Sequence, residues 1–421
     1  MAGMGPEPVR LMTALSTLRV WSWAMYDFAL TVFAMNIVSR YFVLWLINAH
    51  HGADWMYSVA FAVSTGIAAL LMPFAGAASD RQGQRMPFLR AATLLCVAGT
   101  AVLHWCPSAF SALIAFGIAN VGCQMGGLFY DALLPTVAQQ ARIGWVSGLG
   151  VALGYVGAAV GLWLARGAVR QDGYGAAFLP SALLILVAAL PCLCLVRDAR
   201  PIAGGSSAAP RLCWRSAQRL FVGPQRQPGL LRLLVGCFFG LNAINTVIMF
   251  MAVYAKRVAG FNDLQIDVLL LLSTPFALAG ALLSGWCVDR LGPRRCLIGM
   301  FILWCGAIIL GVAIQNAQWM WAVGPLVGIC LGGTWTTGRA FLVALSPPEH
   351  QGLLFGAYGF VGRASSNIGP LMWGQIVQAR ALLGPWTDRL ALASLLVLCG
   401  VALVCFWRLP DVRRYAAPAA R

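Results

Sequence analysis

Gly76-Ala-Ala-Ser-Asp80-Arg81-Gln-Gly83-Gln-Arg85 is a polar stretch between two long apolar runs, and a near copy recurs as Gly285-Trp-Cys-Val-Asp289-Arg290-Leu-Gly292-Pro-Arg294. The two aspartates are 209 residues apart, 289 minus 80, in a chain of 421 residues. Each copy has a small residue for close helix packing, an acid, a glycine for a tight turn and a basic end, as a short loop between two membrane-spanning helices requires. The repeat predicts a chain built from one unit used twice.

The composition places this repeated unit in a membrane. Hydrophobic residues make up 60% of the chain, charged residues 10%, and the mean hydropathy is +0.78, which leaves too little polar surface for a soluble protein of this size. The net charge of +16 would suggest nucleic acid in a soluble protein. Here nearly all basic residues lie between apolar segments, where they set orientation, so we expect no nucleic-acid partner.

The sequence carries no pattern of an enzyme, a cofactor site or a metal site. Its 13 cysteines are scattered, without Cys-x-x-Cys, and only Cys192 and Cys194 are close in sequence. The two glutamates and four histidines form no zinc-protease motif, and no nucleophile elbow is present. A phosphate-binding Walker loop is excluded because the only lysine, Lys256, follows alanine. We therefore predict no cofactor and an energy source in an ion gradient or the solute's own gradient.

Apolar runs of spanning length define the expected architecture. Twelve such runs fall at 20–46, 55–78, 86–106, 109–137, 143–166, 175–196, 230–255, 264–288, 294–314, 318–345, 351–379 and 389–407. The sequence predicts an all-α membrane protein of two pseudo-symmetric six-helix bundles, 1–196 and 229–421. They are joined by a basic cytoplasmic linker at 197–228, which contains Gly-Gly-Ser-Ser. The first 19 residues lack the apolar stretch of a cleavable signal.

The basic residues also predict the orientation. With the N-terminus inside, cytoplasmic segments hold 20 Lys and Arg, the opposite side holds 6, and Arg40, Arg339 and Arg363 fall within helices. An excess of this kind predicts both termini in the cytoplasm. We expect a multi-pass protein of the cell membrane, inner or plasma, and a monomer.

Polar and small residues form stripes on several runs. At 100° per residue, one face of the fourth predicted helix carries Asn120, Gln124, Gly127 and Asp131. One face of the tenth carries Gly328, Gly332, Trp335 and Arg339. One face of the eleventh carries Gly356, Gly359, Arg363, Ser366, Asn367 and Pro370. The seventh run offers only Asn242 and Asn245. Such stripes should face protein or a water-filled cavity and not lipid.

Charged residues inside the runs are the first candidates for function, because a charge at bilayer depth costs several kcal/mol unless it faces protein or water. Asp27, Asp131 and Arg339 lie about 10 Å from the cytoplasmic edge, and Arg363 about 18 Å. Our hypothesis is that they line one central cavity, with Arg363 near its floor. The alternative is an Asp to Arg lock that holds helices together and binds nothing.

The repeated loop resembles the signature loop of the major facilitator superfamily. Further stretches resemble its branch of vacuolar amino-acid effluxers and their bacterial relatives: Trp23-Ala-Met-Tyr-Asp27-Phe-Ala, Ser147-Gly-Leu-Gly150 with Gly154-Tyr155, Pro347-Pro-Glu349 leading to Phe355-Gly-Ala-Tyr358, and Gly362-Arg363-Ala-Ser-Ser366. The resemblance implies twelve helices in two bundles with alternating access around a central site, and the first, fourth, seventh and tenth helices nearest the pore.

The chain departs from this branch in three places. Leu30-Thr31 stand where an Asn-Ser pair is usual, and Arg363 stands where a lysine is usual. The fourth helix also lacks the arginine of proton-coupled drug exporters and carries Asp131 on its polar face. These departures put the amino-acid specificity in doubt and disfavour that mechanism of drug efflux.

The sequence thus predicts a secondary transporter that moves a small polar or zwitterionic, amino-acid-like solute outward, with protons as the candidate coupling ion. The predicted substrate-binding residues are Asp27, Asn120, Gln124, Asn242, Asn245, Trp335, Arg339 and Arg363. Asp27 and Asp131 are the predicted proton carriers. The predicted gating residues are Gly76, Asp80, Arg81, Gly83, Arg85, Gly285, Asp289, Arg290, Gly292 and Arg294. The alternatives are a receptor or assembly factor that translocates nothing, and a drug or lipid exporter.

Overall fold

The computed structural model describes residues 6–50, 54–198, 229–314, 316–366, 368–379 and 384–411. These residues fold into helices joined by short turns, and none of them lies in a strand.

The predicted linker at 197–228 lies outside the described residues except for Arg197 and Asp198. The Asp198 carboxylate accepts hydrogen bonds from the backbone N–H groups of Arg85 and Met86, at 2.7 and 3.1 Å, and so caps the start of the third predicted span.

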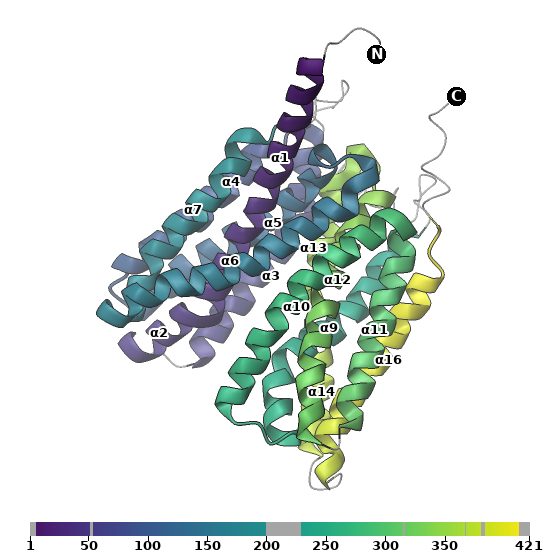
Figure 1. The fold of residues 1–421 in the computed structure, drawn as a ribbon. Coiled ribbons are helices and arrows are strands. Elements are labelled where there is room, and N and C mark those ends of the chain that lie inside the picture. Colours follow the sequence, from purple (N-terminus) through teal and green to yellow (C-terminus); the bar gives the residue numbers. More distant parts are fainter. Residues whose placement is uncertain are drawn as a thin grey trace. The chain divides into compact units, whose positions relative to one another are not determined.

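Contacts divide the chain into two compact units, and each is described by itself. Unit 1 is Met1–Ala208 together with Pro348–Gly356. Its helices are α1 (Pro6–Val32), α2 (Phe42–His50), α3 (Asp54–Gln82), α4 (Met86–Val102), α5 (Ala109–Val137), α6 (Ile143–Asp172) and α7 (Phe178–Leu195). Helix α1 packs against α6 and α7, and α5 packs against α3 and α4 (Figure 1).

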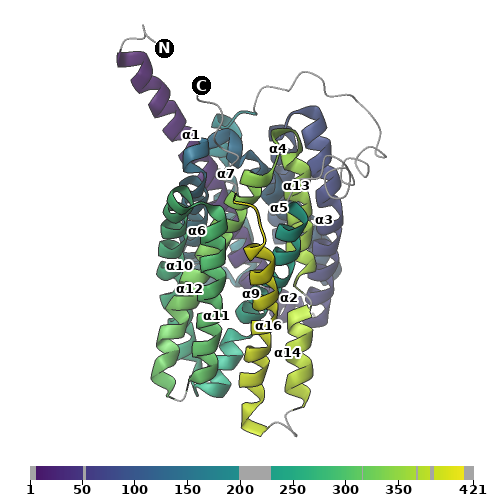
Figure 2. The same ribbon diagram turned by 90° about the vertical axis from the view of Figure 1, so that its right-hand side faces the viewer.

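Unit 2 is Ala209–Pro347 together with Ala357–Arg421. Its helices are α9 (Leu230–Val258), α10 (Asp263–Leu291), α11 (Pro293–Ala313), α12 (Met320–Leu345), α13 (Gln351–Ala364), α14 (Ile368–Gln378) and α16 (Thr387–Trp407). Helix α13 begins in unit 1 and continues into unit 2 after Gly356. Helices α14 and α16 lie side by side in both views (Figures 1 and 2).

The packing order of unit 1 is repeated in unit 2. In unit 1 the pairs are α3 with α5, α4 with α5, α4 with α7, α1 with α6 and α1 with α7. In unit 2 the corresponding pairs are α10 with α12, α11 with α12, α11 with α16, α9 with α14 and α9 with α16. The repeat seen in the two signature loops therefore extends to which helices pack against one another in each unit.

Two of the twelve predicted spans are not regular α-helices. The first changes to a π-helix over Phe33–Tyr41 before it continues as α2. The eleventh, predicted as one helix over 351–379, is broken between Ala364 and Ile368. The prediction of a continuous helix was therefore wrong. Pro370 explains part of the break, because it has no N–H to donate to the Ser366 carbonyl, as a continuous helix would require, whereas in the first turn of α14 its N–H is not needed.

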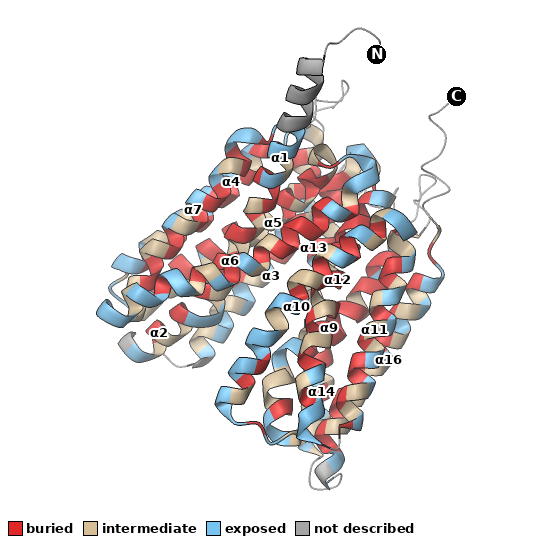
Figure 3. Ribbon diagram, viewed as in Figure 1, coloured by how far each residue is buried: buried red, intermediate tan, exposed pale blue. Residues whose placement is uncertain are grey.

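The helix surfaces fit a lipid environment. Eleven helices of the described residues are long and apolar enough to cross a membrane, and the eleventh predicted span is missing from this set because its two parts are short. Buried residues gather where helices of one unit meet, and exposed residues lie on their outward faces (Figure 3). Large apolar side chains such as Leu70, Phe74 and Leu271 are 58–71% exposed. Patches of this kind are rare in water and expected against acyl chains.

Candidate functional site

The Asp27 carboxylate of α1 is half-buried among groups from α5 and α6. The Tyr130 hydroxyl donates a 3.4 Å hydrogen bond to Asp27 Oδ2. Gly154 of α6 leaves the room beside it, because a Cβ there would lie 2.8 Å from the Thr31 hydroxyl and 3.5 Å from the Asp27 carboxyl group. A side chain at this position would therefore clash with the Thr31 hydroxyl and fill the space next to the carboxylate. The stretch of α1 that contains Asp27 and the glycine-rich stretch of α6 therefore meet at this point.

An aromatic stack supports this carboxylate. Tyr130 is stacked on Trp23, with ring centroids 4.3 Å apart, and on Tyr26, at 5.3 Å. Trp23 Nε1 donates to the Tyr130 carbonyl at 3.0 Å, and the Tyr26 hydroxyl bonds Thr93 Oγ1 at 2.7 Å. Tyr130 is not among the site residues predicted from the sequence. Its only signal is its place directly before Asp131, just beside the polar stripe.

The predicted stripe of α5 has two different environments. Asn120 is 2% exposed, and its Nδ2 donates to Ser64 Oγ at 2.8 Å and to Thr65 Oγ1 at 3.1 Å. The Asn120 amide therefore joins α5 to α3. Gln124 and Asp131 lie further along the same helix and are half-buried. Helix packing accounts for the Asn120 contacts, whereas the other two residues keep partial access to their surroundings.

In unit 2, two asparagines of α9 hold the break of the eleventh span. Asn242 is fully buried, and its Oδ1 accepts a hydrogen bond from the backbone N–H of Gly369, in the first turn of α14. Asn245 Nδ2 donates to Ser366 Oγ at 3.0 Å. The Asn242 Nδ2 is buried and has no hydrogen-bond partner. A discontinuous helix with polar side chains at the break is a common form of solute site in membrane transporters.

Replacing Gly369 with alanine should disrupt this break. A Cβ at position 369 would lie 1.9 Å from Thr246 Oγ1 and 2.7 Å from Asn242 Oδ1, both held in buried hydrogen bonds. We expect Gly369→Ala to destabilise the protein by about 2 kcal/mol, measured as a lower melting temperature in detergent. Gly374→Ala is the matched control on α14, because nothing lies within 4 Å of its new Cβ. An equal effect of the two changes would contradict the close packing.

The predicted arginines also lie in unit 2. Arg363 is half-buried in the last turn of α13, and its Nη1 donates to the Gly359 carbonyl at 3.3 Å. Arg339 of α12 is 6% exposed, and Trp335, one turn earlier, is half-buried. Asn242, Asn245 and Arg363 are therefore brought to the same stretch of unit 2, the end of α13 and the start of α14.

The first signature loop contacts the start of α13 within unit 1. The Asp80 carboxylate accepts hydrogen bonds from the backbone N–H groups of Gly352 and Leu353, both at 2.8 Å. Arg85 makes a 3.1 Å ion pair with Asp80 and a 3.2 Å hydrogen bond with Gln351 Oε1. The Asp80 side chain is 6% exposed and the Arg85 side chain 12%. A buried carboxylate thus caps the amino end of α13, where the helix dipole favours negative charge.

Close backbone contact allows this cap to form. A Cβ at Gly76 would lie 2.0 Å from the Gly352 carbonyl oxygen, so the two glycines pack backbone to backbone. Gly83 has φ +62°, a left-handed conformation that favours glycine. Arg81 is half-buried beside it.

The second signature loop makes contacts inside unit 2. The Arg290 guanidinium lies 4.1 Å over the Trp286 ring, Gly292 has φ +90°, and Arg294 donates to the Trp407 carbonyl. The other two motif residues of this copy are Gly285, which is buried, and Asp289, which is half-buried. The turn at glycine is common to both loops, whereas the contacts described for the two arginines of this copy differ from those of Arg85.

The predicted site residues therefore fall in two groups. Asp27, Asn120, Gln124 and Asp131 belong to unit 1, and the remaining predicted substrate-binding residues belong to unit 2. Their meeting in one cavity stays a prediction, since each unit is described by itself. Among the described residues, no three His, Cys, Asp or Glu side chains are grouped as a metal site would need.

Comparisons with known proteins give a consistent result. A family model described as "Vacuole effluxer Atg22 like" matches residues 138–417. An uncharacterized MFS-type transporter of Bacillus subtilis, YxiO, is 23% identical over 408 residues, which are 91% of this chain and 94% of that protein. The multidrug resistance protein MdtG of Serratia proteamaculans is 23% identical over 82% of this chain and 83% of its own length.

A solved structure shows the fold. The human organic anion transporter MFSD10 (TETRAN) matches with a TM-score of 0.72 and 15% identity, over 97% of this chain and 100% of that chain. Likeness at this level of identity concerns the fold alone. It confirms the prediction of two related six-helix bundles.

Proposed function

Because the chain belongs to the Atg22-like family within the major facilitator superfamily, we propose that it moves a small polar or zwitterionic, amino-acid-like solute outward by alternating access, coupled to protons. The chain is a multi-pass membrane transporter. The observation that carries the proposal is the Asp27 carboxylate of unit 1, which lies within a helix long and apolar enough to cross a membrane and accepts a hydrogen bond from Tyr130. A charge in this position is costly unless it has a function or a partner.

Asp27 is suited to bind the ammonium group of the solute. It is half-buried, and Gly154 keeps the space beside its carboxylate free of a side chain. A carboxylate can accept several hydrogen bonds at once, so an ammonium group can bind it alongside the Tyr130 hydroxyl. Asp131, on the same face as Gln124, takes the proton that drives the cycle. Proton transfer by a buried carboxylate needs no other cofactor.

Unit 2 supplies the groups for the solute's carboxylate. Arg363 presents a guanidinium, which binds carboxylates through two parallel hydrogen bonds. The neighbouring break offers Asn245, Ser366 and the unpaired Nδ2 of Asn242. Arg339 and Trp335 of α12 complete the predicted set.

Replacing Arg363 with glutamine should weaken solute binding more than turnover. The change removes a charge-assisted hydrogen bond to a carboxylate, so we expect KM to rise about tenfold or more. Arg363→Lys keeps the charge, so its KM should lie between those of the wild type and of Arg363→Gln. Transport kinetics at graded solute concentrations measure the effect. A KM that is unchanged in Arg363→Gln would remove Arg363 from the binding site.

We propose that the two signature loops act as gates. Asp80, Arg85 and Gly76 hold the start of α13 in unit 1, and release of that contact would let α13 follow unit 2. In this proposal the second loop does the same in the second half of the chain, through Asp289, Arg290, Gly292 and Arg294.

We further propose that both termini lie in the cytoplasm, because the basic residues are in excess on that side. In this proposal a single chain suffices for transport.

Solute flux in proteoliposomes tests the function. Purified protein is reconstituted with a pH-sensitive dye inside, and amino acids, short peptides and sugars are added one by one. A solute-dependent proton movement that requires the protein supports the proposal. Binding detected by a thermal shift without any flux would support a receptor instead.

Export of drug-like molecules is a second candidate. It is favoured by the similarity to MdtG, whose name describes multidrug resistance. The same liposomes distinguish the two functions, because a hydrophobic fluorescent cation would then be transported and amino acids would not. Competition between the two kinds of substrate would show that they share one site.

A further inference from the structure

Three exposed arginines of unit 1 form a cluster that the proposed transport site does not use. Arg166 and Arg170 are one turn apart near the end of α6, and Arg40 belongs to the π-helix that follows α1. Among the residues that the structure describes, no carboxylate forms an ion pair with any of the three. Asp172, two positions after Arg170, lies on another side of the helix. Positive charge is therefore left without a counter-charge at this end of unit 1.

Contacts between the first span and α6 bring Arg40 and Arg166 to the same level. The two helices run parallel, since α6 passes Asp27 first and then accepts a 3.0 Å hydrogen bond from Asn36 Nδ2 at the Gly161 carbonyl. Arg40 follows Asn36 by four residues, and Arg166 follows Gly161 by five. Each arginine thus lies about 6 to 8 Å beyond this hydrogen bond.

Tyr41 lies close to both arginines. The Arg40 guanidinium carbon is 5.8 Å from the centre of the Tyr41 ring, and the Tyr41 hydroxyl donates to the Leu162 carbonyl, one turn before Arg166, at 3.4 Å. Both guanidinium charges act on the Tyr41 phenol. Two positive charges near one ring repel each other, and an anion bound to both would remove this repulsion.

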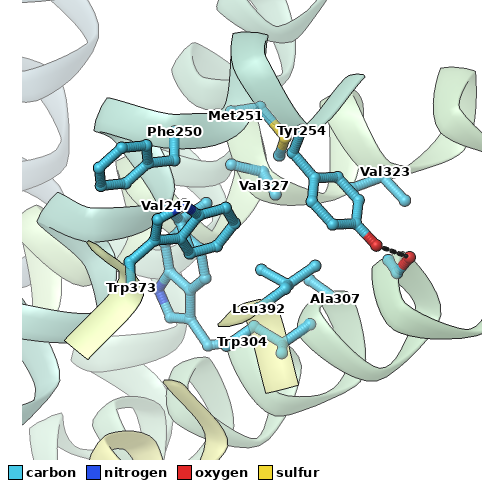
Figure 4. Close-up of a pocket in the computed structure, with 12 residues that line it drawn as sticks. Val247, Phe250, Met251, Tyr254, Trp304, Ala307, Val323, Val327, Trp373 and Leu392 are labelled. Carbon is cyan, nitrogen blue, oxygen red and sulfur yellow. Dashed lines mark hydrogen bonds between the residues drawn. The ribbon is translucent and has the colours of Figure 1, made fainter. Parts of the chain in front are cut away.

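The comparable end of unit 2 has its charges paired. Helix α9 takes the place of α1 there, and its Tyr254 hydroxyl also donates to a carbonyl of a neighbouring helix, at 2.7 Å, as the dashed line in Figure 4 shows. The basic residues that follow are Lys256 and Arg257, which form ion pairs with Asp263 at 2.6 Å and with Asp388 at 3.3 Å. The arginine cluster of unit 1 is therefore not a general feature of helix ends in this chain.

The face of α6 that carries the cluster continues an apolar surface. Trp163 precedes Arg166 by three residues and Arg170 by seven, so the three share one face of the helix, and Trp163 is 73% exposed. Leu164 beside it is 45% exposed. An exposed tryptophan near the end of a spanning helix is typical of the depth where lipid headgroups begin. The arginines therefore follow the apolar surface at the level of lipid phosphates.

We propose that the arginine cluster binds the headgroup phosphate of an anionic phospholipid. A guanidinium binds phosphate through parallel charge-assisted hydrogen bonds, and Arg40 and Arg166 can share one phosphate from two helices. Trp163 packs against the glycerol and upper acyl chain of the same lipid. A zwitterionic headgroup would bring its own positive charge towards three arginines, so an anionic headgroup is preferred. This site lies outside the proposed transport site and does not depend on what the transporter moves.

Photolabelling of the wild-type protein in phosphatidylcholine nanodiscs tests the preference. One sample contains phosphatidylglycerol with a diazirine on the acyl chain next to the glycerol, and the other contains the same analogue with a choline headgroup at the same mole fraction. Mass spectrometry measures adducts on the peptide that contains Trp163. The anionic analogue should label this peptide about tenfold more than the choline analogue. Equal labelling would overturn the proposal. Loss of the label on addition of glycerol phosphate at the concentration of the analogue would do so in favour of a soluble anion.

A double variant tests the role of the arginines. Arg40→Gln with Arg166→Gln should lower labelling of the Trp163 peptide by the anionic analogue about tenfold or more, since each arginine at a membrane surface adds to the binding of anionic lipid. Arg19→Gln with Arg142→Gln removes the same charge from exposed positions of unit 1 outside the cluster and should leave this labelling unchanged. The melting temperature in detergent shows that both variants are folded. An equal loss of labelling in the two double variants would contradict the site.

Discussion

Replacing Asp27 with asparagine should abolish solute transport, by about a hundredfold or more, without unfolding the protein. Asparagine has the same shape and can still accept the hydrogen bond of the Tyr130 hydroxyl at Oδ1. The aromatic stack behind it should therefore remain. What is lost is the negative charge and the ability to carry a proton, which the proposed cycle needs. Proton-coupled flux in liposomes and the melting temperature of the purified protein measure the two effects separately.

The comparison with other aspartates makes the result specific. Asp263→Asn is a matched control, because Asp263 is 85% exposed and pairs with Lys256 at the surface, where such a pair contributes little. Asp131→Asn should resemble Asp27→Asn if both residues serve one pathway. If Asp27→Asn transports normally, the carboxylate is not part of the cycle. If it aggregates while Asp263→Asn does not, Asp27 belongs to a structural lock.

Local sequence chemistry was sufficient to predict most of the helices. The predicted run 109–137 coincides with α5, because the capping box of Ser108 and Ser111 starts the helix and the apolar pattern continues from there. The turns of the two signature loops could likewise be read from Gly83 and Gly292. Signals of this kind act over a few residues, so a single sequence is enough to predict helix starts and turns.

Long-range contacts could not be predicted in the same way. The break of the eleventh span depends on Asn242, which is 127 residues from Gly369, and a run of serine, asparagine and glycine is equally compatible with a polar stripe. Asn120 looked like a pore residue from its spacing, but Ser64 and Thr65 of another helix engage its amide. The place of Tyr130 directly before Asp131 was too weak a signal, because aromatic residues are common in any spanning helix. Partners on neighbouring helices decide the role of each of these residues.

Gly76→Ala, at the contact of the first signature loop with the start of α13, should have the second large effect on transport. Gly76→Ala would put a Cβ 2.0 Å from the Gly352 carbonyl oxygen, and rotation of a side chain cannot relieve this clash, because the obstacle is backbone. The start of α13 would have to move away from α3. Overpacking of this kind costs about 3 kcal/mol, which is roughly a hundredfold in the population of the packed state. Transport that passes through this state should slow by a similar factor.

Hydrogen exchange at the amides of Gly352 and Leu353 measures this release directly, because both N–H groups are bonded to the Asp80 carboxylate. Their exchange should be about a hundredfold faster in Gly76→Ala, as expected for loss of local protection. Gly66→Ala is the matched control on α3, since nothing lies within 4 Å of its new Cβ, and it should change neither exchange nor transport. Slow transport with unchanged exchange at these amides would mean that Gly76 acts elsewhere and that the cap on α13 is not the gate.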